Sequence, residues 1–192
     1  MVAAVRVHKI GGPEVLTFEE VDVPPPGPGQ IRIRQRACGL NFIDTYFRSG
    51  LYAAPAGLPL IPGPEGAGEV TAVGPGVNDL KVGDRVTYVL ALGGYSAERI
   101  LPAERALKLP DGVGFDQAAG MMLKGMTACY LLRRLFKVEK GMNVLIHAAA
   151  GGVGVIACQW ANLLGANVIG TVGSPEKGEI AKANGCHHVI LY

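Results

Sequence analysis

The sequence has few cysteines, no long apolar run and no recognisable leader. Its cysteines are far apart and form no C-x-x-C pair, which argues against a structural zinc site; they are Cys38, Cys129, Cys158 and Cys186. No stretch approaches the roughly 18 apolar residues of a membrane span. The N-terminus shows no basic region ahead of an apolar core, so we expect no secretory signal. We therefore expect a cytoplasmic protein without membrane association, whose cysteines are reduced and buried like small apolar side chains.

Charged residues are also scarce, because they make up 18% of the sequence against about 25% in typical soluble domains. The formal net charge is +2, which argues against a protein built mainly to bind nucleic acid. A short basic cluster at Arg133, Arg134 and Lys137 is more simply interpreted as the exposed last turn of a helix. Hydrophobic residues make up 49%, which predicts a folded core rather than a disordered chain.

Proline is nearly absent from the second part of the chain. Twelve of the thirteen prolines lie at or before Pro110, and proline is excluded from helix interiors and central strands. We therefore expect short strands and turns in the first part. The expected strands span 31–34, 66–74 and 85–90. After Pro110, apolar spacing predicts helices at 118–123 and 127–136, so we place a domain boundary near 110–125.

A glycine-rich turn joins a predicted strand to a predicted helix in the second part. Residues 143–148 form an almost continuous apolar run, which is typical of a parallel strand covered on both faces. Residues 149–154 follow with the pattern A-x-G-x-x-G, and helical apolar spacing then continues to Leu164. A second β-rich run occupies 167–172. In this strand–turn–helix–strand context the pattern indicates a dinucleotide-binding fingerprint. The alternative is a tight turn that binds no ligand.

Each glycine of this turn has an expected role. Gly151 lets the backbone approach a pyrophosphate, and Gly154 allows the helix to pack close to the strand. The helix N-terminus contributes N–H donors and a partial positive charge. The candidate cofactor-binding residues of the turn are Ala149, Gly151, Gly152, Val153 and Gly154.

The end of the second strand favours NADPH over NADH. NAD sites usually carry Asp or Glu about 20 residues after the glycine turn, where it binds the ribose 2′-hydroxyl. Here the strand tip is Gly173 and Ser174, with no acid. We expect Ser174 to cap the next helix, with Pro175 in its first position. Glu176 would begin that helix and need not face the ribose. Lys177 offers a cation for a 2′-phosphate; the alternative is an exposed lysine with no ligand.

Four motifs together resemble one family. They are GGPEVL at 11–16, GLNFIDTY at 39–46, GDRV at 83–86 and HAAAGGVG at 147–154. Along its whole length the sequence is similar to the NADPH:quinone oxidoreductases, the zeta-crystallin-like branch of the medium-chain dehydrogenase/reductases. The resemblance implies an α/β protein in which a GroES-like, β-rich substrate and catalytic domain occupies 1–124. A Rossmann domain, with a doubly wound parallel sheet, would begin at 125 and be incomplete at 192.

The resemblance also implies an activity and its residues. Family members transfer a hydride from NADPH to quinones or to other activated alkenes and carbonyls, usually as homodimers. Asn41 and Thr127 resemble residues that line the nicotinamide pocket. Tyr46 and Tyr52 are expected to supply an apolar wall and hydroxyl donors near the acceptor oxygen, although packing in a loop would equally explain Tyr52. Tyr192 matches a position near the adenosine phosphate.

The zinc alcohol dehydrogenases share this fold, so the metal question depends on ligand positions. By resemblance, their first zinc cysteine corresponds to Asn41, and their histidine ligand to Pro64. Proline has no donor atom and asparagine is a poor zinc ligand. Cys186, His187 and His188 form another cluster, but adjacent strand residues face opposite sides. We therefore expect no catalytic zinc, and a conventional alcohol dehydrogenase is disfavoured.

Length is the main departure from the family. A doubly wound fold has two βαβαβ halves, whereas this sequence ends at about its third parallel strand. We therefore expect it to be C-terminally truncated, and we expect the 192 residues alone to reduce quinones poorly. The alternative function is that of a non-catalytic, NADPH-binding structural or RNA-binding protein of the crystallin type.

Overall fold

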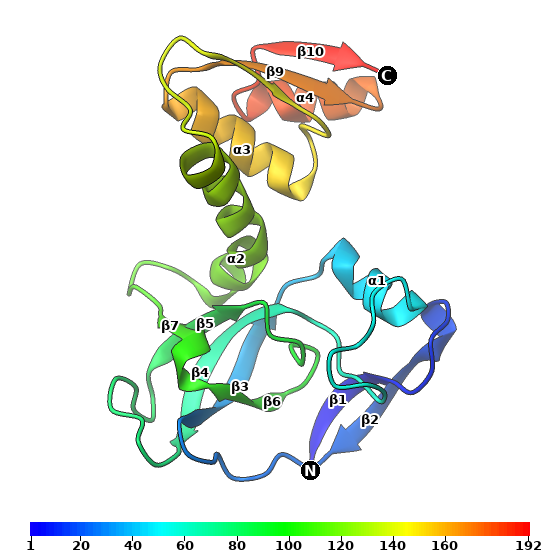
Figure 1. The fold of residues 1–192 in the computed structure, drawn as a ribbon, viewed down its shortest axis with the longest axis vertical. Coiled ribbons are helices and arrows are strands. Elements are labelled where there is room, and N and C mark those ends of the chain that lie inside the picture. Colours follow the sequence, from blue (N-terminus) through cyan, green and yellow to red (C-terminus); the bar gives the residue numbers. More distant parts are fainter. The chain divides into compact units, whose positions relative to one another are not determined.

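The computed structural model describes residues 1–192, which form two compact units, Met1–Leu123 and Lys124–Tyr192 (Figure 1). The division lies one residue before the boundary expected at 124/125. Each unit has its own cluster of buried apolar side chains, so each is described by itself. None of the helices combines the length and the apolar character that a membrane span requires.

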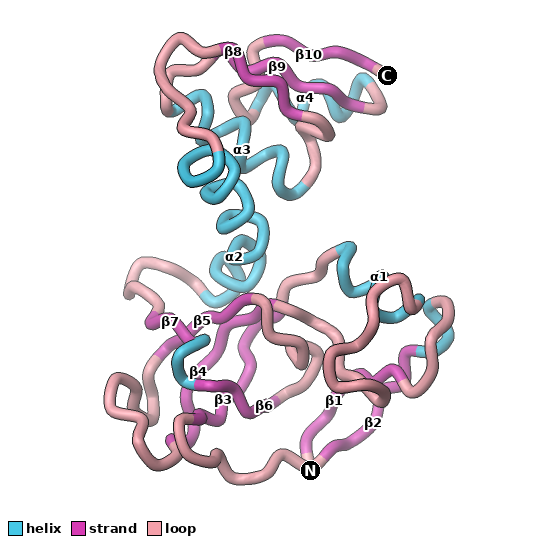
Figure 2. Tube along the Cα trace, viewed as in Figure 1, coloured by secondary structure: helices cyan, strands magenta, loops and turns pink.

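The first unit is built from antiparallel strands joined by loops and short helical turns (Figure 2). A two-stranded sheet pairs β1 (Val2–Val7) with β2 (Leu16–Val21). The five-stranded sheet has the order β6 (Glu98–Pro102), β3 (Gln30–Cys38), β4 (Glu65–Val73), β5 (Arg85–Val89) and β7 (Ala106–Lys108). The 3₁₀ turns η1 (Pro13–Val15) and η2 (Ala103–Arg105) complete the unit's connections. The strands expected at 31–34, 66–74 and 85–90 are therefore confirmed in β3, β4 and β5, except that Gly74 and Leu90 lie just beyond the ends of β4 and β5.

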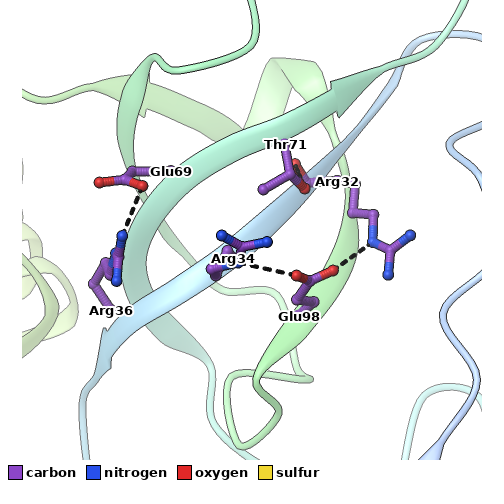
Figure 3. Close-up of polar contacts among 6 residues, drawn as sticks. All are labelled: Arg32, Arg34, Arg36, Glu69, Thr71 and Glu98. Atoms are coloured by element: carbon purple, nitrogen blue, oxygen red, sulfur yellow. Dashed lines mark hydrogen bonds and ion pairs between the residues drawn. The ribbon is translucent and has the colours of Figure 1, made fainter. Parts of the chain in front are cut away.

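Alternation along β3 separates the core of this sheet from an outer row of charges. Ile31 and Ile33 are fully buried and pack in one cluster with Tyr88. The arginines between and after them form the row seen in Figure 3. There Arg32 and Arg34 both pair with Glu98, at 2.7 and 3.1 Å, while Arg36 pairs with Glu69 at 3.0 Å. These pairs tie β3 to β6 on one side and to β4 on the other.

We expect Glu98→Ala to lower the free energy of unfolding by about 1–3 kcal/mol, because it removes a largely buried carboxylate that forms ion pairs with two guanidinium groups and accepts a hydrogen bond from Arg34. The matched control is Glu69→Ala, whose more exposed pair with Arg36 should contribute only about 0–1 kcal/mol. Denaturant titrations of both variants measure the difference. Equal losses for the two would contradict the larger contribution to stability that is expected of Glu98.

The helical region after Pro110 differs from the expectation. The sequence predicts separate helices at 118–123 and 127–136, but the structure has one continuous run. The helix α2 (Phe115–Cys129) passes directly into a π-helical segment, η3 (Tyr130–Leu135), which ends where Phe136 turns extended. No proline interrupts 115–135, so nothing in the backbone forces a break. The prediction of two helices was wrong, although most of their residues are helical.

The second unit contains a parallel sheet of three strands and two helices that follow its first two strands. The sheet has the order β10 (His188–Leu191), β9 (Asn167–Val172) and β8 (Asn143–Ile146). Helix α3 (Gly152–Leu163) follows β8, and α4 (Pro175–Ala183) follows β9. Sequential strands are neighbours, as in the first half of a doubly wound sheet. The helix expected up to Leu164, the strand expected at 167–172 and the helix expected to begin at Pro175 are confirmed.

One face of this parallel sheet is uncovered, in contrast to the expectation for 143–148. Val144, Ile146 and Val168 point to the core shared with α3 and α4. On the other face, Leu145 is 54% exposed and Ile190 is 51% exposed. Successive strand residues point to opposite faces, and the helices of this unit pack on one face only. The strand was correctly identified, and within these 192 residues only one of its two faces is buried.

The four cysteines are all free thiols, but they are not uniformly buried. Cys158 and Cys186 lie in the core of the second unit, and burial raises the pKa of Cys158 to about 11, with a smaller contribution from Cys186. Cys129 is half-buried, and Cys38 is exposed at the end of β3. The expectation that each is a buried apolar residue was therefore wrong for Cys38.

Candidate functional site

A short helix that the proline-rich composition did not predict places three of the candidate residues. Helix α1 (Phe42–Ser49) begins directly after Asn41, whose backbone is extended, and stops at Gly50, which has a φ of +80°. Asp44 accepts a hydrogen bond from the Asn41 backbone N–H at 2.9 Å. This is half of a capping box, and it holds the first turn of the helix against the residue before it.

Two buried carboxylates surround Asn41. Glu65, the first residue of β4, is fully buried; its Oε1 accepts from Asn41 Nδ2 at 2.7 Å and its Oε2 from the Leu123 backbone N–H at 2.6 Å. Asp44 is 6% exposed, and its Oδ2 also accepts from the Tyr95 hydroxyl at 2.7 Å. Burial and the nearby Asp44 raise the pKa of Tyr95, so the phenol keeps its proton. Sequence reasoning missed Asp44 and Tyr95 as neighbours of Asn41.

The two candidate tyrosines lie together beside α1. The Tyr46 and Tyr52 rings make an edge-to-face contact with centroids 5.4 Å apart. The Tyr52 backbone N–H donates to the Tyr46 carbonyl at 3.1 Å, and Phe47 also contacts the Tyr52 ring. Tyr52 remains 47% exposed. The expected aromatic grouping is therefore present, with one ring accessible from solvent.

The donor set around Asn41 lacks the ligands of a metal centre. Pro64 precedes the buried Glu65, and the Asn41 amide already donates to that carboxylate. In residues 1–192, no group of three or more His, Cys, Asp or Glu side chains is arranged to hold a metal ion. Although Cys38 is exposed, partial desolvation by the surrounding protein and the nearby Asp44 raise the pKa of its thiol, which disfavours the thiolate that zinc binds.

The glycine-rich turn of the second unit is tight. Ala148 adopts a left-handed backbone with a φ of +52°, and the Gly151 N–H donates to its carbonyl at 2.8 Å. A Cβ on Gly154 would overlap that same carbonyl oxygen and lie 2.8 Å from the Ala149 Cα. The close packing predicted for Gly154 is therefore required here. The strained Ala148 was not predicted, because alanine carries no sequence signal for a positive φ.

The remaining candidates of this unit gather at the carboxyl ends of the three parallel strands. The turn after β8 carries 149–154, β9 is followed by Gly173 and Ser174, and β10 by Tyr192. A Cβ on Gly173 would lie 3.7 Å from the Tyr192 ring, so the two residues are neighbours. In open α/β sheets, ligands bind beyond this edge. The candidate residues at the ends of these three strands thus lie along one edge of the sheet.

The first turn of α4 is arranged as expected. The Ser174 Oγ accepts from the Lys177 N–H at 3.3 Å, with Pro175 in the first helical position. Hydrogen bonding to Ser174 lowers the pKa of Glu176, which is exposed on the same turn. The Lys177 side chain is exposed. The capping prediction is confirmed, and the strand tip itself carries no acid.

Two further residues of the second unit belong to this description. Thr127 lies on α2 and is half-buried. Lys124 was not among the residues predicted from sequence to lie near the glycine-rich turn. Its aliphatic side chain packs against Gly152, the first residue of α3, because a Cβ on Gly152 would lie 2.9 Å from the Lys124 Cδ. A single lysine within the apolar run 118–128 was the signal available for it.

Comparisons with known proteins agree with this arrangement. Residues 27–111 match the family model described as "Alcohol dehydrogenase GroES-like domain", and residues 152–192 match "Zinc-binding dehydrogenase". The chain is 53% identical over 193 residues to a quinone oxidoreductase of Pseudomonas aeruginosa and 52% identical to a 2-haloacrylate reductase of a Burkholderia species. Each alignment covers 100% of this chain and 59% of the relative, so the chain spans about three-fifths of their length.

Solved structures give the same result. The Escherichia coli quinone oxidoreductase complexed with NADPH superposes with a TM-score of 0.96 at 48% identity, covering 99% of this chain and 58% of that one. A quinone oxidoreductase of Pseudomonas syringae also reaches a TM-score of 0.96, at 53% identity and the same coverage. Both domain models and the relatives point to a GroES-like domain followed by a Rossmann-like domain. The chain therefore belongs to the medium-chain dehydrogenase/reductase superfamily, in the branch that contains these quinone oxidoreductases.

Proposed function

We propose that the full-length protein is a zinc-independent reductase that transfers a hydride from NADPH to quinones or other activated alkene or carbonyl acceptors. The observation that carries the proposal is the turn before α3, where Gly154 has no room for a side chain and the helix N-terminus is brought against the end of β8. Such a helix start binds a dinucleotide pyrophosphate. The names of the relatives, a quinone oxidoreductase and a 2-haloacrylate reductase, support the acceptor class.

The residues of the second unit fit NADPH. The backbone of 149–154 would hold the pyrophosphate through N–H groups at the start of α3. Tyr192, Gly173 and Ser174 would line the adenosine end, and Lys177 would contact the 2′-phosphate. The cofactor, when bound, supplies the hydride.

The residues of the first unit would hold the acceptor. Tyr46 and Tyr52 offer an aromatic surface that suits a flat quinone ring, with hydroxyl groups for its oxygens. Asn41 would line the nicotinamide pocket, as the family resemblance implies. A small-molecule acceptor is the only partner this proposal requires, and we expect the full-length protein to be a homodimer.

We expect the purified protein to contain far less than one zinc ion per chain. Pro64 offers no donor atom, and the Asn41 amide nitrogen donates to Glu65. Elemental analysis of the protein, with activity measured before and after chelation, tests this. Stoichiometric zinc together with loss of activity on chelation would show that the proposed mechanism is wrong.

The proposed function is tested by following NADPH absorbance with a simple quinone and with an enone. We expect turnover of at least one of them, with NADPH preferred to NADH. Binding of NADPH without turnover of any acceptor would instead support the non-catalytic alternative. Absence of both binding and turnover would overturn the assignment of the nucleotide site.

A further inference from the structure

We propose that Asp44 and Glu65 are positioning residues that together hold Asn41 in one orientation. Asp44 fixes its backbone and Glu65 fixes its side-chain amide. The inference rests on the proposed function, in which Asn41 lines the nicotinamide pocket. Neither carboxylate was among the residues predicted from sequence to bind cofactor or acceptor.

The Glu65 contact determines which way the Asn41 amide points. The amide nitrogen of Asn41 lies 2.7 Å from Oε1 and donates to it, so the amide oxygen points away from Glu65. The second carboxylate oxygen accepts from the Leu123 N–H at 2.6 Å. Gly39 packs directly against this carboxylate, where a Cβ would overlap Oε1. Glu65 is therefore held in place on several sides. Its hydrogen bond with the Asn41 amide restricts the orientation of the Asn41 side chain.

The Asp44 contact is formed differently, because one oxygen makes both hydrogen bonds. Oδ2 accepts from the Asn41 N–H at 2.9 Å and from the Tyr95 hydroxyl at 2.7 Å. Oδ1 is buried and has no hydrogen-bond partner. A buried oxygen without a partner lowers the stability of the fold. We therefore attribute to Asp44 the placing of Asn41 rather than a stabilisation of the fold. Tyr95 lies 51 residues away in sequence and links the start of α1 to the segment before β6.

A fixed Asn41 matters because hydride transfer is sensitive to small displacements. Misplacing a reacting group by about 1 Å can lower the rate about 100-fold. Loosening Asn41 should therefore lower kcat much more than it changes the affinity for NADPH, whose binding is dominated by the phosphate contacts of the second unit.

The different use of the oxygens gives a test that a general structural role does not predict. In Glu65→Gln, the single amide oxygen can accept from Asn41 or from Leu123, but not from both. Either one of these bonds is lost, or the Asn41 amide turns over so that its oxygen faces the new N–H₂; in both cases the wild-type orientation of Asn41 is no longer fixed. In Asp44→Asn, the remaining oxygen can keep both bonds and the N–H₂ takes the place of the orphaned Oδ1. Both variants remove one negative charge and almost no volume.

In the full-length protein we expect Glu65→Gln and Asp44→Ala to lower kcat about 10- to 100-fold. Asp44→Asn should retain clearly more kcat than Asp44→Ala, because its oxygen can still accept both hydrogen bonds. Tyr95→Phe should also lose less kcat than Asp44→Ala. The control is Glu69→Gln, which neutralises an exposed carboxylate on the same strand as Glu65 and should leave kcat unchanged. Circular dichroism melting curves identify any variant that fails to fold. Equal loss of kcat in Asp44→Asn and Asp44→Ala, both folded, would contradict the role given to Oδ2.

A second measurement reads the orientation of Asn41 without turnover. In protein labelled with ¹⁵N-asparagine, the side-chain amide signal of Asn41, assigned by its loss in Asn41→Asp, should show two well-separated protons. The chemical shifts of this signal should change in Glu65→Gln and should stay the same in Glu69→Gln. If the wild-type protein reduces no acceptor, the proposed function fails while this signal still decides whether Asn41 is held. A signal that does not respond to Glu65→Gln, or one that moves while kcat stays at the wild-type value, would overturn the inference.

Discussion

Gly154→Ala is expected to lower the free energy of unfolding by about 3 kcal/mol and to abolish measurable NADPH binding. The new Cβ would overlap the Ala148 carbonyl oxygen and come within 2.8 Å of the Ala149 backbone. These are backbone atoms, so no side chain can rotate to relieve the contact. Alanine would gain about 1 kcal/mol in helix propensity over glycine, which is too little to compensate. The start of α3 must therefore move away from β8, and the pyrophosphate site moves with it.

Gly151→Ala is the matched control in the same turn. Its backbone has a φ of −79°, which alanine adopts freely, and the new Cβ would lie 3.1 Å from the Ala148 oxygen. We expect a small change in stability and a clear loss of NADPH affinity, because the methyl group would stand where the pyrophosphate approaches. Denaturant titration and NADPH fluorescence separate the two effects. Equal destabilisation by both substitutions would show that Gly154 has no special packing role.

Local chemistry explains which parts of the fold were predictable from sequence. Strand β9 was expected at its observed bounds, because a short β-rich run lies between Gly165 and the Ser174-Pro175 cap. The helix after the glycine turn was predictable, because its apolar side chains recur at helical spacing up to Leu164 and Gly165 then ends it with a φ of +79°. Each of these signals depends on residues a few positions apart, so no knowledge of tertiary contacts is needed.

The features that were missed depend on contacts between distant residues. Glu65 lies 24 residues from Asn41, and Tyr95 lies 51 residues from Asp44. Their pairing exists only once β4 and the segment before β6 have been brought to α1. Helix α1 was not predicted, because it lies in the proline-rich part of the chain, where only short strands and turns were expected. The uncovered face of β8 could not be predicted, because it depends on the face of the sheet against which the helices pack. Sequence therefore identified Asn41 as a candidate but not the groups that hold it.

Lys177→Glu is expected to weaken NADPH binding about 10- to 100-fold and to leave NADH binding nearly unchanged. A charge-assisted hydrogen bond contributes about 1.5–3 kcal/mol, which corresponds to this range. Only NADPH carries the 2′-phosphate, so the loss should be confined to it. The cap of α4 should survive, because Ser174 accepts from the Lys177 backbone N–H and not from its side chain. An acid in the first turn is also favourable to the helix, so destabilisation cannot account for the expected effect.

Lys182→Glu provides the control, since it makes the same change of charge at the other end of α4. Lys182 pairs with Glu179 at 2.9 Å and lies away from the tip of β9. We expect both cofactors to bind this variant as they bind wild type. Raising the ionic strength should reduce the preference of the wild-type protein for NADPH, because an exposed lysine acts through a screened charge. Equal weakening of NADPH and NADH by Lys177→Glu would show that Lys177 does not contact the 2′-phosphate, and cofactor choice would then depend on Gly173, Ser174 and Tyr192.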